Sequence, residues 1–171
     1  MSNVKLNNAD EAMTGSSDYY SKLLAQEVLS RGHCIRVKGR GQSMYPLVRT
    51  GDTLDIEPKD PGELKIGDII FYRRFCGDYV AHRLIKRNGP STLLTKGDNH
   101  YYYDMPVPVD AVLGRVIRIE KEDRQLILSG NIAGILGRIS AWLARGRSRK
   151  MTRLWRNMGR VIWFIGGRHK T

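Results

Sequence analysis

The sequence has little cysteine, and beyond residue 123 it has no acidic residue at all. Its two cysteines, Cys34 and Cys76, allow at most one disulfide, so a disulfide-stapled secreted scaffold is excluded. Their spacing does not fit a zinc site either. We therefore expect two separate reduced thiols, and we expect the protein to use neither a metal nor a cofactor.

The N-terminus lacks a hydrophobic segment. Residues 1–18 are polar, and they do not contain a basic start followed by an apolar run. We accordingly expect neither a signal peptide nor a transmembrane helix ahead of the body. The length of 171 residues suits one domain with a sizeable core and leaves room for an appendage.

The positive charge is divided unevenly along the chain. Residues 1–123 hold 18 Lys and Arg against 17 Asp and Glu, whereas residues 124–171 hold 11 Lys and Arg and no acid. A nearly neutral body with a basic tail is typical of proteins that contact a polyanion. Anionic lipid and nucleic acid are the two candidates for that partner.

The hydrophobic pattern predicts one helix followed by a series of short strands. Asp18 can cap the helix and Gly32 can end it, with Leu23, Leu24 and Val28 on the side expected to face the body. From His33 the period changes to two. Strand-like runs bounded by turn residues are 33–38, 54–57, 68–73, 79–87, 92–96, 112–120 and 125–128. Without alternating long helices, they predict a mainly β fold with an antiparallel sheet, either a sandwich or a coiled half-barrel.

After Gly130 apolar residues recur at helical spacing in two sets, separated by the basic segment 145–150. Two basic amphipathic helices with tryptophan at their boundaries predict attachment to a membrane interface. The alternative is that the first helix packs on the sheet. The predicted organisation is a lead-in and short helix over 1–32, a β-rich domain over 33–129, and a basic amphipathic helical tail over 130–171.

Ser43 is the candidate nucleophile because it follows the glycine-flanked turn 39–41 and precedes Met-Tyr-Pro. An ordinary turn serine would show the same local pattern. A nucleophile needs a base and a group that orients the base. Of the four histidines, His82 lies within an apolar strand, and the loop after the next strand carries two carboxylates, Asp98 and Asp104. Either carboxylate can accept a hydrogen bond from an imidazole.

Four blocks follow one another along the chain: Gly41-Gln42-Ser43-Met44-Tyr45-Pro46, Ile66-Gly67-Asp68-Ile69-Ile70-Phe71, Ala81-His82-Arg83, and Thr95-Lys96-Gly97-Asp98-Asn99 with Asp104 and a closing Pro-Val. In this order they resemble the signal peptidase I superfamily, and more narrowly its archaeal and endoplasmic-reticulum branch, which uses histidine where the common bacterial enzymes use lysine. The resemblance covers roughly residues 35–120. It implies a coiled β catalytic core, a fold shared with SOS-type repressors, and a Ser-His-Asp endopeptidase.

The resemblance assigns a role to each candidate residue. Ser43 is similar to the nucleophile and His82 to the general base. Asp104 matches the acid that orients the base, with Asp98 as a supporting or alternative acid. The backbone N–H of Ser43 would stabilise the oxyanion. Many relatives carry a second donor, a hydroxyl, two places before the serine, and here that position is Gly41.

These observations predict a serine endopeptidase that cleaves extended, signal-peptide-like segments with small residues before the scissile bond. The expected partners are a peptide or preprotein substrate and an anionic membrane surface. We expect the protein to attach peripherally to that membrane through its tail, and the sequence does not specify which side of the membrane it occupies. Nucleic acid is the second choice. The alternative function is a self-cleaving or inactive regulatory protein on the same fold, bound to membrane or nucleic acid through its basic tail.

Overall fold

The strands form one antiparallel sheet that coils into a half-barrel, as the sequence predicted. The computed structural model describes residues 21–122, 124–128, 163 and 168–169. Within these residues the sheet order is β1-β2-β7-β3-β4-β5-β6, and β8 pairs with β7 and β9. The strands are β1 (Ile35–Lys38), β2 (Thr53–Glu57), β3 (Ile69–Arg73), β4 (Tyr79–Arg87), β5 (Thr92–Lys96), β6 (Val107–Pro108), β7 (Val112–Lys121), β8 (Arg124–Ile127) and β9 (Arg168–His169). Two short 3-10 helices, η1 (Pro61–Glu63) and η2 (Val109–Ala111), lie between strands.

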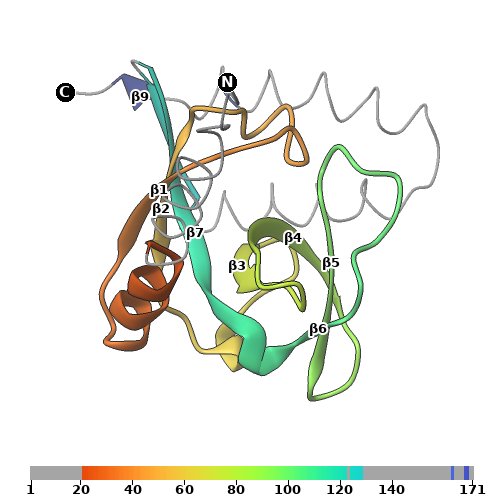
Figure 1. Ribbon diagram of the computed structural model, residues 1–171. Helices are drawn as coiled ribbons and strands as arrows, with labels where there is room; N and C mark the ends of the chain where they lie inside the picture. Colours follow the sequence, from red (N-terminus) through yellow and green to blue (C-terminus); the bar gives the residue numbers. More distant parts are fainter. Residues whose placement is uncertain (1–20, 123, 129–162, 164–167, 170–171) are drawn as a thin grey trace, which may run out of the picture.

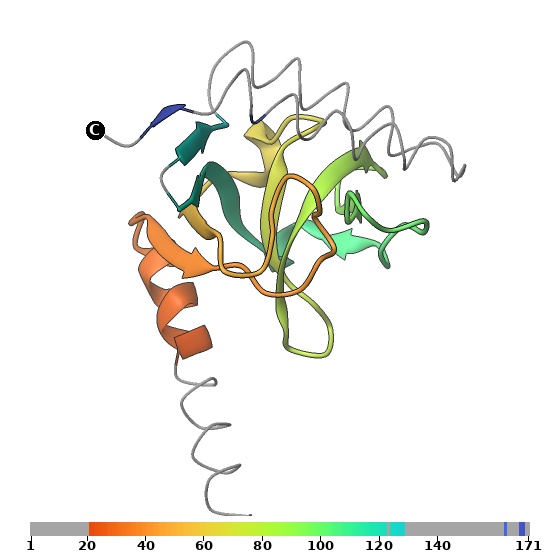
Figure 2. The ribbon, with the colours of Figure 1, turned by 90° about the horizontal axis from the view of Figure 1, so that it is seen from above.

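The sheet bends where its register shifts. Shifts occur between Asp55 and Ile56 in β2, and between Phe71 and Tyr72 in β3. A third separates Leu84 from Lys86 in β4. Such bulges increase the local twist, which lets a sheet curl back on itself. Seen from above, the strands wrap around a shared interior (Figure 2).

Two clusters of buried side chains fill the fold. One cluster lies between β1, β2, β7 and the loop before β2, and it includes Ile56, Ile119 and Leu47. The other packs around β3, β5 and β6, with Tyr72, Leu93 and Val107 among its members. Because β7 pairs with both β2 and β3, it joins the two halves of the sheet.

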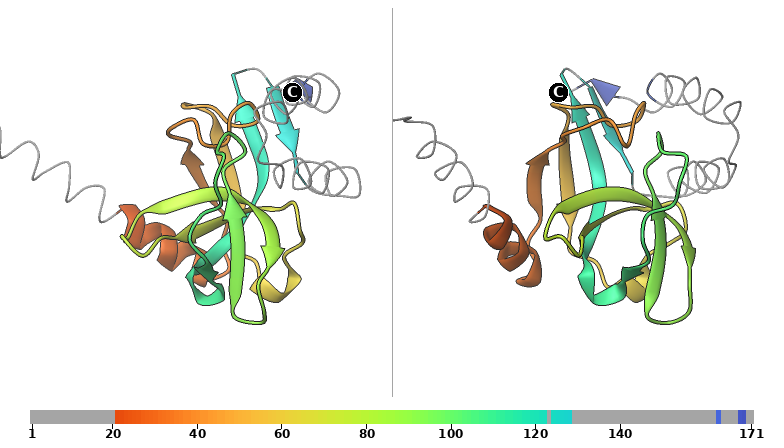
Figure 3. Two further views of the ribbon diagram at one scale, coloured as in Figure 1. Left: turned by 90° about the vertical axis from the view of Figure 1, so that its right-hand side faces the viewer. Right: turned by 45° about the vertical axis from the view of Figure 1, so that its right-hand side comes forward.

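The N-terminal helix is described over residues 21–30 and lies beside the edge strand β1 (Figures 1 and 3). Its end follows the prediction, because Gly32 donates to Leu29 and His33 donates to Val28 in a Schellman arrangement. The predicted packing face is wrong in part. Leu24 is 64% exposed and Leu23 45%, whereas Leu29 is only 2% exposed and joins the core.

The basic C-terminal region was predicted to form amphipathic helices, and this prediction falls mostly outside the described residues. Three of its residues are described: Trp163 is buried, and Arg168–His169 form β9, which pairs with β8. In the part of the chain that the structure describes, no helix is both long and apolar enough to cross a membrane. The predicted boundary at residue 129 stays a prediction.

Candidate active site

Ser43 lies in a loop of residues 39–52 that connects β1 to β2, referred to here as the Ser43 loop. At the base of this loop the N–H of Gly39 donates to the carbonyl of Asp52, and the N–H of Gly51 donates to the carbonyl of Gly39. Three buried side chains of the loop are anchored in the first core cluster, and they are Met44, Leu47 and Val48. Ser43 itself is half-buried, so the loop presents its hydroxyl at the edge of a packed core.

His82 brings an imidazole to that hydroxyl from β4. Its Nε2 lies 2.9 Å from the Oγ of Ser43, and the residue is only 1% exposed. Because β3 pairs with β4 along its length, Ile70 lies opposite His82 and holds the strand in register. The histidine is therefore placed by the sheet, and the serine is placed by its loop.

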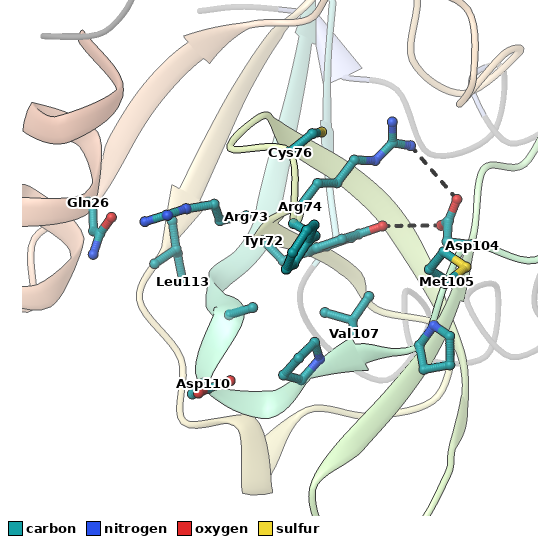
Figure 4. A pocket seen from close by; sticks show the side chains of 14 residues that line it. Gln26, Tyr72, Arg73, Arg74, Cys76, Asp104, Met105, Val107, Asp110 and Leu113 are labelled. Atoms are coloured by element: carbon teal, nitrogen blue, oxygen red, sulfur yellow. Dashed lines mark hydrogen bonds and ion pairs between the residues drawn. The ribbon is translucent and has the colours of Figure 1, made fainter.

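Asp104 completes a hydrogen-bonded chain on the other side of the imidazole. Its Oδ2 lies 2.7 Å from Nδ1 of His82. The same oxygen accepts a hydrogen bond from Oγ1 of Thr95 at 2.7 Å, and the hydroxyl of Tyr72 lies 3.2 Å away. Figure 4 shows Tyr72 and Arg74 pointing towards the Asp104 carboxylate, with a guanidinium nitrogen of Arg74 3.9 Å from Oδ1.

These contacts keep Asp104 ionised. Burial alone would raise the pKa of Asp104, but the hydrogen bonds from His82, Thr95 and Tyr72 outweigh burial and hold the pKa below its usual value. Burial also raises the pKa of Tyr72 to about 12, so its phenol keeps the proton that it can donate. An ionised Asp104 fixes the proton of His82 on Nδ1, which leaves Nε2 free to accept the Ser43 proton.

Asp98, the supporting or alternative acid, has a different partner. Its two oxygens accept hydrogen bonds from Nε and Nη2 of Arg83 at 2.7 and 2.6 Å, and both side chains are buried. Arg83 also donates to the carbonyl of Gly67 at 2.7 Å. The pair thus ties the loop after β5 to the turn before β3, while Nδ1 of His82 donates its hydrogen bond to Asp104.

The loop after β5 also clamps the Ser43 loop, which the sequence reasoning missed. Asn99 donates its backbone N–H to the carbonyl of Ser43 at 2.8 Å and its side-chain amide to the carbonyl of Gln42 at 3.2 Å. The approach is so close that a Cβ at Gly97 would lie 2.8 Å from the Ser43 carbonyl oxygen. There is no room for a side chain at this position, which explains the glycine in the Lys-Gly-Asp motif.

His100 stands at the edge of the same site. Its ring lies edge-on to the ring of His82, with centroids 5.5 Å apart. Burial, followed by the charge of His82, lowers the pKa of His100 below its usual value. Because His100 stays neutral, it does not repel a protonated His82. From the sequence, His100 was one of four histidines, and nothing indicated that it lies next to His82.

The backbone N–H of Ser43 has no acceptor assigned among the described residues, so it can donate to a developing oxyanion. Gly41 has a φ of 82°, which is a left-handed conformation that glycine adopts without strain. Its carbonyl accepts a hydrogen bond from Thr50 at 3.0 Å. The Gly41 position thus contributes loop shape.

Three further features of the described residues concern metal ligands, thiols and a cavity. Within them no group of three or more His, Cys, Asp or Glu side chains is arranged to hold a metal ion. Both cysteines are free and exposed. A cavity of about 910 Å³ borders the site, and Tyr72, Arg74, Asp104 and Met105 contribute to its lining (Figure 4).

Comparison with known proteins identifies the family of the chain. A comparison with curated proteins gives no match. A family model described as Peptidase S24-like matches residues 2–117, which is more than half of the 171-residue chain. The coiled antiparallel half-barrel is consistent with that family, which has a serine peptidase-type fold. The chain therefore belongs to the Peptidase S24-like family.

Proposed function

We propose that the protein is a serine endopeptidase in which Ser43 is the nucleophile, His82 the general base and Asp104 the residue that orients His82. The observation that carries this proposal is the continuous chain from Ser43 Oγ to His82 Nε2, at 2.9 Å, and from His82 Nδ1 to Asp104 Oδ2, at 2.7 Å. Three side chains from a loop, a strand and a second loop meet in the order that acyl transfer requires.

The proposed reaction proceeds in two halves. Ser43 Oγ attacks the scissile carbonyl carbon while its proton passes to His82 Nε2, and the negative charge on the carbonyl oxygen is stabilised by the Ser43 backbone N–H. The imidazolium, stabilised by Asp104, then donates that proton to the departing amine as the C–N bond breaks. Water, activated by His82, hydrolyses the acyl-enzyme and restores Ser43.

The substrate is proposed to be an extended peptide. The pairing of β5 with β4 begins at Arg83, and residues 79–82 of β4 pair only with β3 among the described residues. This leaves one backbone edge of β4, next to His82, on which an extended chain can add as a strand. The resemblance to the histidine-using signal peptidase branch supports a preference for small residues before the scissile bond.

The activity is tested with purified full-length protein and paired peptides. One peptide carries alanine at the first and third positions before the scissile bond, and its partner carries phenylalanine at both. We expect cleavage of the alanine peptide after the first position, and a much lower rate for its partner. Failure to cleave either peptide, with cleavage of the protein's own chain instead, would support the self-processing alternative that the sequence left open.

We further propose that the basic C-terminal region attaches the protein peripherally to anionic membrane surfaces. The support is compositional: residues 124–171 hold 11 Lys and Arg and no acid. The full chain is expected to float with vesicles of phosphatidylcholine containing phosphatidylserine, and not with phosphatidylcholine alone. Replacement of Arg153, Arg156 and Arg160 by glutamine should weaken flotation. Absent flotation combined with salt-sensitive binding to a DNA duplex would contradict the proposal.

A further inference from the structure

Trp163 is a described residue of the C-terminal region that packs against the Ser43 loop. It is only 8% exposed and belongs to the same core cluster as Met44, Leu47 and Val48 of the Ser43 loop. Its indole N–H donates a hydrogen bond of 3.0 Å to the carbonyl oxygen of Leu47. A residue 116 positions away in the chain therefore packs directly beneath the loop that carries Ser43.

This hydrogen bond satisfies a buried backbone group. Among the described residues, the indole of Trp163 is the donor assigned to the Leu47 carbonyl, and Leu47 is itself buried. A buried carbonyl without a donor is unfavourable, so the loop conformation depends on Trp163 being in place. Leu47 is four residues from Ser43, and it lies within a single tight turn in which the N–H of Val48 donates to the carbonyl of Met44.

A second set of contacts links Trp163 to the far end of the loop. Nζ of Lys121, in β7, lies 4.8 Å from the centroid of the Trp163 rings, within the range of a cation–π interaction. The same nitrogen is 3.8 Å from Oδ2 of Asp52. That carboxylate oxygen in turn accepts a hydrogen bond of 2.8 Å from the backbone N–H of Arg49. Trp163 thus contacts the loop directly at Leu47 and indirectly at its last residue.

The loop is therefore held from two directions by segments that are distant in sequence. Asn99 fixes the carbonyls of Gln42 and Ser43 from the loop after β5. Trp163 fixes the carbonyl of Leu47 from the C-terminal region, which is also attached to the sheet by the pairing of β9 with β8. If either support is lost, the Ser43 hydroxyl is free to move relative to His82, which the sheet holds in place.

We propose that Trp163 is a positioning residue for Ser43, so that the C-terminal region is a working part of the catalytic unit. The role rests on the proposed peptidase function. It acts through the Ser43 loop, because the interactions assigned to Trp163 among the described residues go to Leu47 and Lys121. Displacement of a nucleophile by about 1 Å can lower a rate on the order of 10²-fold, so a modest loosening of this loop has a measurable effect.

The test uses Trp163→Phe in the full chain, which keeps an aromatic ring in the core but removes the N–H donor. With the alanine peptide, we expect kcat to fall on the order of 10- to 100-fold while KM changes little. Amide hydrogen exchange at residues 44–49 should become faster. The control is Leu64→Ala, which removes a buried side chain of the other core cluster and is expected to lower stability without altering either readout at a temperature where the protein is folded.

The outcomes separate this proposal from the one it rests on. Wild-type protein that cleaves no peptide would sink the peptidase assignment and the positioning role with it. Active wild-type protein with an unchanged kcat in Trp163→Phe would overturn the positioning role alone. An equal fall of kcat in Leu64→Ala would do the same, because the effect would then follow from stability and not from the contact with Leu47.

Discussion

Replacement of Ser43 by alanine is expected to lower kcat for cleavage of the alanine peptide by a factor on the order of 10⁶. Without the hydroxyl, His82 has no proton to accept and no acyl-enzyme forms. The remaining groups can only bind the substrate and polarise its carbonyl, so a small rate above the uncatalysed reaction is expected to remain. Initial rates at saturating peptide, with mass spectrometry of the products, measure the effect.

The fold of this variant should be intact. Ser43 is half-buried and its carbonyl, which Asn99 binds, is unaffected by the substitution. Thermal unfolding is therefore expected to resemble that of the wild type. Ser91→Ala is the matched control, because this serine is exposed and lies in the turn before β5. Cleavage by purified Ser43→Ala at even a hundredth of the wild-type rate would reject Ser43 as the nucleophile.

The same substitution identifies the substrate in cells. Protein N-termini are compared between cells that carry the wild-type chain and cells that carry Ser43→Ala. New mature N-termini present only with Ser43 would give the substrates and the residues before each scissile bond. A single new N-terminus within this chain would instead indicate self-processing, which is the alternative function predicted from the sequence.

Most of the strands could be predicted because the local sequence of each strand, and the turn residues on either side of it, indicate its position. β4, for example, was predicted at its observed bounds, Tyr79–Arg87, from its β-rich composition and its flanking turn residues. The two-residue strands β6 and β9 carry no such pattern. The sheet order was also not predicted, because the insertion of β7 between β2 and β3 is decided by non-local packing.

The residues proposed to act in the site could be named from the sequence, but their supports could not. Ser43, His82 and Asp104 stand in ordered blocks, and the structure brings these three together. Tyr72 looks like any strand tyrosine, and Thr95 like any strand threonine. Only the pairing of β3, β4 and β5 places their hydroxyls beside Asp104. Trp163 lies further still from the loop that it contacts, and the helical pattern of its region gave no indication of that contact.

Asp104→Asn is expected to lower kcat on the order of 10⁴-fold with little change in KM. An asparagine amide can donate to Nδ1 and so stabilise the tautomer with its proton on Nε2, which cannot accept a proton from Ser43. The neutral side chain also fails to stabilise the imidazolium. Thr95→Val removes one donor to Asp104 but keeps the carboxylate, so a smaller fall, about tenfold, is expected. Steady-state kinetics on the alanine peptide rank the variants.

The pH dependence of unfolding gives an independent measure of the Asp104 carboxylate. Because the pKa of Asp104 is lower in the folded protein than in the unfolded chain, its ionised form stabilises the fold at neutral pH. That contribution is present above the unfolded pKa, near 4, and is lost as the pH falls through the lower folded pKa. The difference in unfolding free energy between wild type and Asp104→Asn should therefore shrink between pH 7 and pH 3, as measured by urea denaturation.

Asp98→Asn distinguishes the orienting acid from the structural one. Asp98 and Arg83 are buried and bonded through two hydrogen bonds, so the substitution leaves a buried guanidinium without its counter-charge. A loss of stability of about 3–5 kcal/mol is expected, far larger than that of Asp104→Asn. Any folded Asp98→Asn protein should keep most of its kcat, because the carboxylate that accepts the hydrogen bond of His82 Nδ1 is that of Asp104. The reverse pattern, with kcat lost in folded Asp98→Asn and kept in Asp104→Asn, would transfer the orienting role to Asp98.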